Sequence, residues 1–369
     1  MRYFVVLSLL LVVLYANKVV TAEDVYAIYK SKGIKAVEDY LVKEFQAKEI
    51  AKAKEAKAKE LTVEKKETVT EKKESVAVKL LDDITPKEAQ SKDFWNKYLK
   101  NKNVQYGYYE NLNTLLICEK EKKRLEVYKN GEDGIKFVKA HDVIVGKNGD
   151  KLKEGDLKTP VGVYEITRRF KPSDQFYGPL AFSLSYPNVY DKLRGKNGNG
   201  IWIHGSPLDG GPRGESSKGC IVMDNPIITS LDTEIDPKSA LTIIGEDEIP
   251  KTSKESLAII LSEFYKWQHA WKGHDANKYL AFYSDNFIRF DGMKKSDFSK
   301  MKKRIFSKKE KKEIKFKDVN ISPYPSLDGR KLFKISFYEI YKSNSFKYNG
   351  EKELYVELKK DKLLILAER

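Results

Sequence analysis

A histidine and a cysteine sixteen positions apart are the side chains of this sequence best suited to chemistry. They are His204 and Cys220, in the segment IWIHGSPLDGGPRGESSKGCIVMDN. A histidine within hydrogen-bond reach of a cysteine can accept the thiol proton, and a nearby cation lowers the thiol pKa, so that the sulfur becomes a nucleophile. Lys218 supplies such a cation two residues before the cysteine. The alternative is that Cys220 is a small buried apolar residue and that His204 is structural.

The residues around this pair suit an acyl-transfer site. Gly219 leaves room for the backbone of a substrate, and the amides of Gly219 and Cys220 are candidates to stabilise an oxyanion. Ser217 belongs to the same predicted loop, and Trp202 lies two residues before His204, where its ring could pack against a peptide. No Asp or Asn is clearly placed in the sequence to orient the imidazole. We therefore expect a backbone carbonyl to orient it.

Metal binding and disulfide bonding are not predicted. The four histidines are scattered and lack the close spacing of metal ligands. Of the two cysteines, Cys118 lies on a predicted strand away from the motif, and its surroundings do not suggest pairing with Cys220. We expect no metal and no cofactor, and we interpret Cys118 as a buried residue without a role in the reaction.

Short β-rich segments surround the motif and must position it. Between residues 113 and 245 the sequence alternates in short runs separated by turn signals: TLLICEKEKKRLEVYKNG, DVIVGKNGD, GVYEITRRF, LAFSLSYP, GIWIHG, GCIVMDN and ALTIIG. This pattern predicts a mainly β domain over residues 113–248. Residues 249–369 begin with a helical segment and end in alternating strands, which predicts an α+β domain.

The first residues predict export. Arg2 precedes an apolar run over 3–15, and small residues at Val20 and Ala22 fit a cleaved secretory signal over 1–22. The run is shorter than the roughly 20 apolar residues of a membrane-spanning helix. Because no later segment could cross a bilayer, we expect no membrane span after removal of the signal.

Composition divides the segment between the signal and the β domain. Residues 23–45 have helical periodicity, 46–79 are built almost wholly of Lys, Glu, Ala, Thr and Val, and 80–112 are helical and aromatic. The middle part lacks the apolar residues for a core, so we interpret it as a spacer, with a peripheral charged helix as the alternative. The amphipathic N-terminal segment makes a homodimer possible.

The chain of 369 residues is basic, with 69 Lys and Arg against 54 Asp and Glu. Most of the excess lies from Lys251 onward, where 28 Lys and Arg face 16 Asp and Glu. Such a balance predicts an anionic partner. Export argues against nucleic acid and favours the carboxylate-bearing cell wall. We expect the run MKKRIFSKKEKKEIKFK to hold the protein on the wall, and we expect deletion of the last domain to leave hydrolysis of small soluble substrates measurable.

The motif HGSPLDGGPRGESSKGCIVMDN resembles the signature of the YkuD-type LD-transpeptidase family, in which a His-Gly pair is followed after a dozen or so residues by Ser/Thr-His-Gly-Cys. Upstream, GDLKTPVGVYEI resembles the family's Thr-Pro-x-Gly-x-Tyr segment. The resemblance covers about residues 113–245. It implies that Cys220 is the acyl-forming nucleophile, that His204 is its base and that the carbonyl of Gly205 orients the imidazole.

Two positions differ from the common family pattern. Lys218 stands where the family has the histidine before Gly-Cys, and Val222 stands where it usually has an arginine. The chain is more similar to the LD-carboxypeptidase branch of curved and helical Gram-negative bacteria, which combines Ser-Lys-Gly-Cys with a C-terminal nuclear-transport-factor-2-like domain. WQHAWKGHDANKYLAFYSDNF resembles the first helices of that domain.

This branch implies a periplasmic enzyme that trims peptidoglycan muropeptides and influences cell shape. The implied reaction removes the terminal D-alanine from a tetrapeptide stem and leaves a tripeptide. Lys218 could bind a stem carboxylate; Tyr177, Arg194 and Arg213 are weaker candidates for substrate contact. Two alternatives remain: an LD-transpeptidase that forms cross-links or attaches proteins, and a non-catalytic wall-binding scaffold. In the last domain, the spacing of His269, Asp275 and Asp285 does not define an acid–base set.

Overall fold

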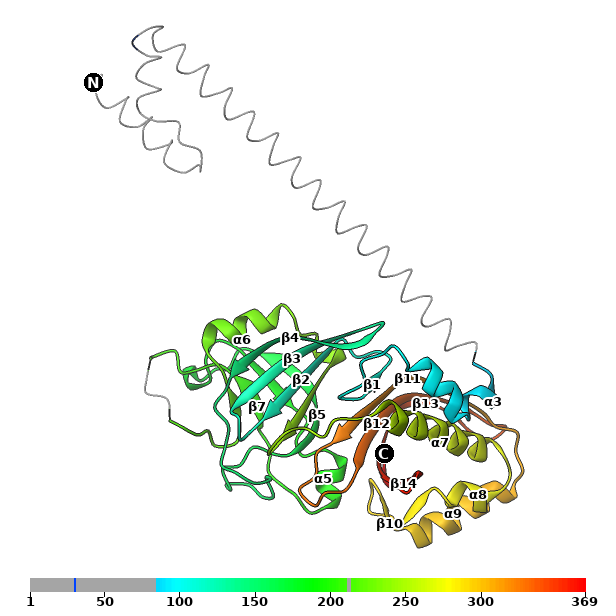
Figure 1. Ribbon diagram of the computed structural model, residues 1–369. Coiled ribbons are helices and arrows are strands. Elements are labelled where there is room, and N and C mark those ends of the chain that lie inside the picture. Colours follow the sequence, from blue (N-terminus) through cyan, green and yellow to red (C-terminus); the bar gives the residue numbers. More distant parts are fainter. Residues whose placement is uncertain (1–29, 31–83, 211–213) are drawn as a thin grey trace. The chain divides into compact units, whose positions relative to one another are not determined.

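The computed structural model describes residue 30 and residues 84–210 and 214–369. The predicted signal peptide, the spacer and, except for Lys30, the helical segment that could mediate pairing lie outside the described residues. Within the described residues no helix is long and apolar enough to cross a membrane. The part from Ile84 to Arg369 forms one compact unit, and Figure 1 shows its two sheets.

Two short capped helices open this unit. In α3 (Pro86–Ala89) the Thr85 side chain accepts from the Glu88 amide, and the Glu88 carboxylate accepts from the Thr85 amide. In α4 (Lys92–Tyr98), Trp95 is fully buried and its ring stacks on Tyr265 at 5.7 Å between centroids. The helices therefore pack against the C-terminal domain, to which Tyr265 belongs.

The catalytic candidates lie in an eight-stranded sheet with the order β4-β3-β2-β9-β5-β6-β7-β8. Its strands are β2 (Thr114–Glu119), β3 (Arg124–Gly131), β4 (Gly134–Asp142), β5 (Gly162–Phe170), β6 (Ala181–Leu184), β7 (Trp202–His204), β8 (Ile221–Val222) and β9 (Ala240–Gly245). The pairs β2–β9 and β7–β8 are parallel and the others antiparallel. Helices α5 (Val189–Leu193) and α6 (Asn225–Asp232) and the 3₁₀ turns η1 (Gln175–Tyr177) and η2 (Pro237–Ser239) lie in the connections.

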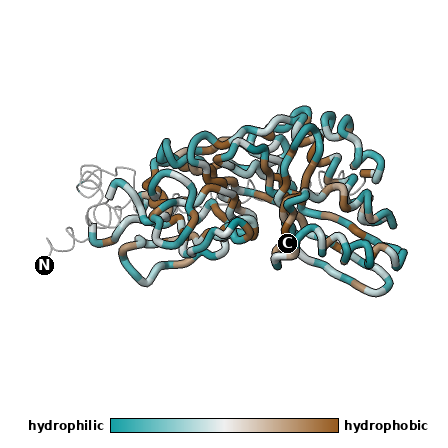
Figure 2. The backbone as a smooth tube through the Cα atoms, turned by 90° about the horizontal axis from the view of Figure 1, so that it is seen from below, coloured by the Kyte–Doolittle hydropathy of each residue, from teal (hydrophilic) through white to brown (hydrophobic). Residues whose placement is uncertain are grey.

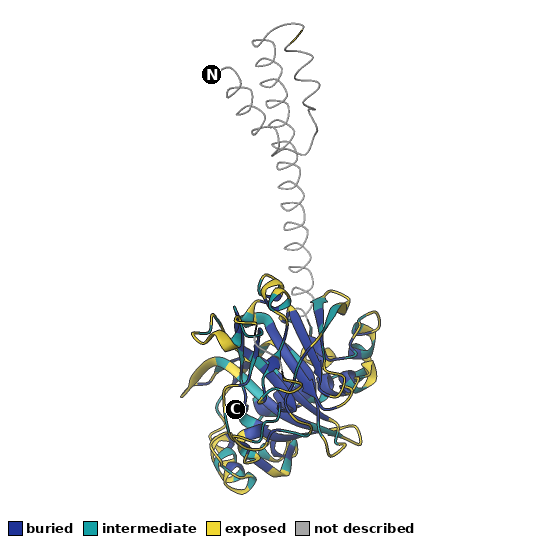
Figure 3. Cartoon of the chain, turned by 90° about the vertical axis from the view of Figure 1, so that its left-hand side faces the viewer, coloured by how far each residue is buried: buried dark blue, intermediate teal, exposed yellow. Residues whose placement is uncertain are grey.

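Both faces of this sheet are covered at its strand β2. Its side chains alternate between two hydrophobic cores: Leu116 and Cys118 belong to the first core, and Leu115 and Ile117 to the second. All six residues of β2 are buried. Figure 3 shows the buried strands inside the unit and exposed loops around them. Figure 2 shows hydrophobic stretches toward the interior of the backbone trace and hydrophilic stretches at its outer loops.

The C-terminal domain is a six-stranded sheet with the order β1-β11-β12-β13-β14-β10. Its strands are β1 (Tyr108–Tyr109), β10 (Tyr283–Arg289), β11 (Glu313–Tyr324), β12 (Leu332–Lys342), β13 (Lys347–Lys359) and β14 (Lys362–Glu368), accompanied by α7 (Lys254–Lys272), α8 (Ala276–Leu280) and α9 (Lys295–Ser307). Helix α7 buries an aromatic and aliphatic stripe against this sheet. The prediction of a mainly β domain followed by an α+β domain is confirmed.

The two domains share the second core. It unites Tyr190 of α5 with Tyr324, Tyr355 and Leu366 of the C-terminal sheet. The rings of Tyr190 and Tyr355 stack at 5.1 Å with an interplanar angle of 14°. Removal of the C-terminal domain would expose this core to water. The structure therefore does not support the expectation that the domain can be deleted with the catalytic domain left active.

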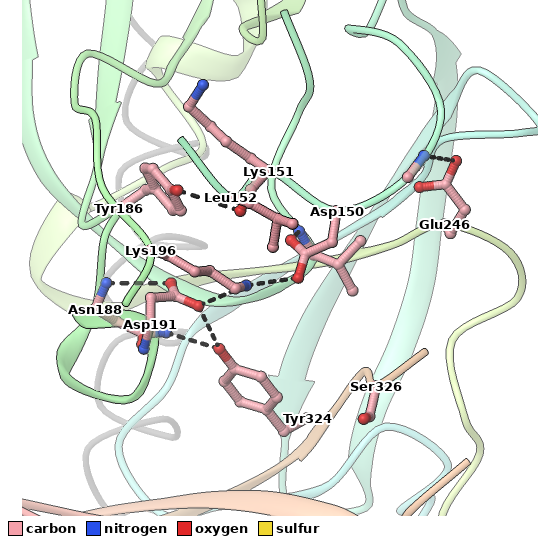
Figure 4. A network of polar contacts seen from close by, with 12 residues as sticks. Asp150, Lys151, Leu152, Tyr186, Asn188, Asp191, Lys196, Glu246, Tyr324 and Ser326 are labelled. Carbon is pink, nitrogen blue, oxygen red and sulfur yellow. Dashed lines mark hydrogen bonds and ion pairs between the residues drawn. The ribbon is translucent and has the colours of Figure 1, made fainter. Parts of the chain in front are cut away.

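A buried polar network crosses the contact between the two domains, which we call the domain seam (Figure 4). Lys196 forms ion pairs with Asp150 at 2.6 Å and with Asp191 at 2.8 Å. Tyr164 donates to Asp191 at 3.0 Å from within the catalytic domain, and Tyr324 donates to it at 3.3 Å from the C-terminal domain. Because buried charges need such partners, this arrangement fixes the two domains against each other.

A second ion-pair group joins the sheets directly. Lys334 of β12 is only 2% exposed; it pairs with Glu165 of β5 and, at 3.1 Å, with Glu353 of β13. Burial by itself raises the pKa of Glu165, but the charge of Lys334 and its hydrogen bond lower it overall. The seam is therefore closed by opposite charges as well as by aromatic packing.

Candidate active site

Strand register brings the predicted nucleophile and base together. In the parallel pair β7–β8, Ile203 lies opposite Ile221 and His204 opposite Val222. Cys220 is the residue before Ile221, and Trp202 is the residue before Ile203, so Cys220 lies beside Trp202. Side chains alternate along a strand, so Trp202, His204 and Cys220 share one face while Ile203 and Ile221 enter the first core on the other. The sixteen-residue separation in sequence thus becomes a neighbouring position in space.

The imidazole of His204 is held by the backbone that follows it. Its Nδ1 lies 2.7 Å from the carbonyl oxygen of Gly205. A carbonyl oxygen can only accept, so Nδ1 carries the proton and donates, and Nε2 is the basic nitrogen of the neutral ring. The residue His204 is 3% exposed, and its carbonyl accepts from the Met223 amide at 2.9 Å. This is the contact that the family resemblance implies for Gly205.

The thiol of Cys220 is held by a backbone carbonyl, and its pKa is raised. Its sulfur donates to the carbonyl oxygen of Gly200 at 3.5 Å. Burial raises the thiol pKa, while the Trp202 amide and the charge of Lys151 lower it by less. A raised thiol pKa disfavours the thiolate, so a base that accepts the proton would assist attack by this sulfur.

The charge of Lys151 lowers the pKa of Cys220, and nothing in the sequence around Cys220 predicts this contribution. Lys151 is 4% exposed; its ammonium group bonds to Asp156 at 2.8 Å and to the Lys153 carbonyl at 3.2 Å. Its side chain points away from the Asp150–Lys196 pair (Figure 4). Lys218, for which we expected this electrostatic role, is exposed. No local signal marks Lys151, because it lies 69 positions before the cysteine.

The loop before Cys220 is organised by its own hydrogen bonds. The Ser217 hydroxyl donates to the Cys220 carbonyl at 2.5 Å and accepts from the Gly219 amide at 3.1 Å. Gly219 has φ 127°, and a Cβ there would lie 2.8 Å from the Lys158 carbonyl oxygen, so only glycine fits. The Gly219 amide is therefore engaged, and the Cys220 amide is the better oxyanion candidate. Substrate contacts by Ser217 and Gly219 stay predictions.

An aromatic wall lines the site beside the imidazole. The Trp202 ring lies 4.9 Å from Phe170 and 4.9 Å from Tyr177, and the Tyr177 ring packs edge-on against His204 at 5.0 Å. Tyr177 therefore belongs to the site. Arg194 lies instead over the ring of Tyr190 at the domain seam. The remaining weak candidate, residue 213, lies outside the described residues.

Three other features could mark a functional site in the described part of the chain: a group of metal ligands, the second cysteine and a cavity. No group of three or more His, Cys, Asp or Glu side chains there could hold a metal ion. Cys118 is fully buried, and burial raises its pKa to about 12. A cavity of about 880 Å³ lies in the C-terminal domain, and Trp271, Lys302 and Glu339 are among its lining residues. Burial lowers the pKa of Lys302 to about 8.

Comparison with known proteins agrees with this arrangement. Residues 113–243 match the YkuD L,D-transpeptidase catalytic domain, and residues 259–369 match the Cds6 C-terminal NTF2-like domain. The helical cell shape determining protein Pgp2 of Campylobacter jejuni is 42% identical, with a TM-score of 0.72 over 76% of this chain and 100% of that chain. A lysine-to-alanine point mutant of Pgp2 is 41% identical, with a TM-score of 0.74 over 78% and 100%.

More distant relatives cover less of the chain or align less closely. Bd1075 of Bdellovibrio bacteriovorus is 26% identical with a TM-score of 0.58, over 73% of this chain and 96% of that chain. YafK of Escherichia coli K12, whose name assigns it to the L,D-transpeptidases, is 34% identical over 119 residues, which are 30% of this chain and 43% of YafK. The chain belongs to the YkuD family of L,D-transpeptidase catalytic domains and has an NTF2-like domain at its C-terminal end.

Proposed function

We propose that this protein is an exported cysteine LD-carboxypeptidase of the periplasm that removes the terminal D-alanine from peptidoglycan tetrapeptide stems. The observation that supports it best is the placement of His204 and Cys220 on one face of β7–β8, with the imidazole oriented by the Gly205 carbonyl. The likeness to Pgp2, a helical cell shape determining protein, over its whole length supports a role in cell shape.

The reaction begins when the sulfur of Cys220 attacks the carbonyl carbon between the L-centre of diaminopimelate and D-alanine. As the C–S bond forms, His204 Nε2 accepts the thiol proton, and the Cys220 amide stabilises the oxyanion. His204 then gives this proton to the departing amine as the C–N bond breaks, which leaves a thioester and free D-alanine. Water attacks the thioester, again losing its proton to His204, and the thiol is regenerated with the tripeptide as product.

Hydrolysis and transpeptidation differ only in the group that attacks the thioester. The LD-transpeptidase alternative requires an acceptor amine to dock before water arrives. At the position where the family usually has an arginine, this chain has the apolar Val222, directly opposite His204 in the strand register. The loss of that cation beside the base favours hydrolysis over transpeptidation.

Mass analysis of muropeptides incubated with the purified mature protein tests the proposal. We expect conversion of tetrapeptide to tripeptide with loss of one alanine, abolished in Cys220→Ala. New cross-linked dimers would instead identify a transpeptidase. An unchanged muropeptide pattern would favour the non-catalytic scaffold.

We further propose that the basic face of the C-terminal domain holds the enzyme on the anionic wall. Its exposed cations include Lys303, Arg304 and Lys308 on and just after α9. The support is the concentration of positive charge in this domain, which attracts polyanions through screened electrostatics.

Charge reversal at these three positions tests wall binding without disturbing the shared core. We expect K303E/R304E/K308E to reduce cosedimentation with isolated sacculi, most strongly at low salt, and to leave hydrolysis of soluble muropeptides intact. A matched control reverses three exposed lysines of the catalytic domain, Lys122, Lys136 and Lys171. Equal losses in both variants, or none in either, would contradict a specific role for the C-terminal face.

A further inference from the structure

Asn225 connects the turn after His204 to the helix that follows Cys220. It is the first residue of α6, and its side-chain oxygen Oδ1 accepts from the Ser206 amide at 2.7 Å. The Ser206 hydroxyl donates to the Met223 carbonyl at 3.0 Å. The backbone after the predicted base is thus tied to the backbone after the predicted nucleophile by two hydrogen bonds.

The Ser206 amide and the Gly205 carbonyl belong to one peptide unit. This unit is planar and trans, so its N–H and C=O point in opposite directions, and a bond that fixes one also fixes the other. On one side the carbonyl accepts from His204 Nδ1 at 2.7 Å. On the other side the N–H donates to Asn225. We propose that Asn225 is a positioning residue that aims the Gly205 carbonyl at the imidazole and thereby orients the catalytic base.

The packing around this peptide explains why position 205 is glycine. A Cβ at Gly205 would lie 2.3 Å from Asn225 Oδ1, so any larger residue would displace the amide. The Gly205 amide donates to the Leu180 carbonyl at 3.3 Å. On the facing strand connection, a Cβ at Gly178 would lie 2.7 Å from the Gly205 Cα. The site is therefore closed around the Asn225 side chain in its present position.

The Asn225 oxygen is not used for helix capping, which is the ordinary role of such a residue. The N-cap of α6 is Asp224, and the side chain of Asn225 bonds outside its own helix. The bonds from Asn225 through the peptide to His204 form a chain, and successive hydrogen bonds polarise one another. A more negative Gly205 carbonyl stabilises the imidazolium that forms when His204 accepts the thiol proton. This role rests on the proposed function only for the assignment of base and nucleophile.

The pH dependence of Cys220 alkylation by iodoacetamide tests this role without a muropeptide. Modification is followed by mass analysis of the Cys220 peptide, so that Cys118 does not interfere. Lys151 and Tyr177 interact electrostatically with Cys220, and His204 lies on the same strand face; all three are kept in every variant. We expect Asn225→Ala to move the profile up by about half to one pH unit and to slow alkylation at pH 7 about fivefold, as loss of one hydrogen bond implies. The plateau rate at high pH stays unchanged, because the thiolate then forms without a base.

Two variants separate positioning from general damage to the helix. Asn225→Asp keeps an oxygen that accepts from the Ser206 amide, and we expect a rate at pH 7 within about twofold of wild type or above it. Thr229→Ala removes an exposed hydroxyl that donates to the Asn225 backbone carbonyl at 2.8 Å but leaves the Asn225 side chain in place, and we expect a wild-type profile.

Three results would overturn the inference: a wild-type profile in Asn225→Ala, an equal shift in Thr229→Ala, or a loss that Asn225→Asp does not restore. A shifted profile in Asn225→Ala together with intact muropeptides in the wild-type assay would leave the positioning role standing and contradict the proposed substrate.

Discussion

The catalytic face and the domain seam each hold a buried lysine paired with aspartate, and the two lysines are equally buried at 4% exposure. At the seam, Lys196 lies between Asp150 and Asp191, and tyrosine hydroxyls from both domains complete the shell of Asp191. At the catalytic face, Lys151 pairs with Asp156 and also acts on the Cys220 thiol, whose described hydrogen bond to Gly200 is long.

The two regions differ in how many hydrogen-bond and ion-pair partners each ionisable group has. Burial first, and then the charge of Asp191, raise the pKa values of Tyr164 and Tyr324, so both hydroxyls remain donors at neutral pH. Their perturbed pKa values accompany a closed structural network. The thiol of Cys220 keeps a raised pKa with weak partners and lies on the same strand face as His204. In this protein a shifted pKa therefore indicates a reactive group only where that group has few or weak hydrogen-bond and ion-pair partners.

Deletion of the C-terminal domain is expected to have the largest effect. A chain ending before α7 would expose Tyr190 and the rest of the second core, so we expect it to lack a cooperative unfolding transition. Circular dichroism melting and soluble yield would measure this. A folded, active fragment would show that the seam is dispensable and would restore the interpretation of two independent domains.

Replacement of Lys334 tests the ion pairs of the seam. We expect Lys334→Met to reduce the free energy of unfolding by about 3 kcal/mol, the lower end for loss of one partner of a buried pair, because Glu165 keeps contact with water. Urea unfolding would measure it. The folded-state pKa of Glu165 is lowered, so its contribution is present at neutral pH and is lost as the pH falls through that value, below the ordinary 4.5. In Lys334→Met the free energy of unfolding should therefore fall less steeply with decreasing pH than in wild type. Equal pH slopes of the free energy of unfolding in the two proteins would contradict the assignment.

The two buried lysines provide the sharpest comparison. Lys151→Met should shift the pH profile of Cys220 alkylation upward, because the charge that lowers the thiol pKa is lost. Lys196→Met should lower the melting temperature and leave that profile at its wild-type position. If both variants shifted the profile equally, the seam and the catalytic face would be electrostatically coupled, and the distinction between them would fail.

The smallest effect on catalysis is expected for Cys118→Ser. Cys118 is fully buried in the first core, and its pKa is raised to about 12, so it has little thiolate at neutral pH. We expect muropeptide turnover near that of wild type. A loss as severe as in Cys220→Ala would show that the roles of the two cysteines are assigned wrongly.

The sequence by itself determined the fold class and supplied the prediction of His204 and Cys220 as the central pair. Alternation in short runs is a local property, and it predicted the strand that ends at His204 and the strand that begins directly after Cys220. The spacing of the His-Gly pair and the Gly-Cys pair is also local, which is why the family could be inferred from one chain.

Tertiary structure alone decided which residues support that pair. Lys151 and Tyr177 reach the site through strand register and loop packing, and Asn225 through a bond to a residue nineteen positions earlier. Lys218 is close to Cys220 in sequence but exposed in the structure, so proximity in sequence did not identify the cation that lowers the thiol pKa. The core shared by the two domains could not be predicted from the sequence either, because no local pattern indicates that the rings of Tyr190 and Tyr355 stack. Local pattern specifies the elements, whereas contacts between distant elements depend on how their faces fit, and that fit exists only in the folded chain.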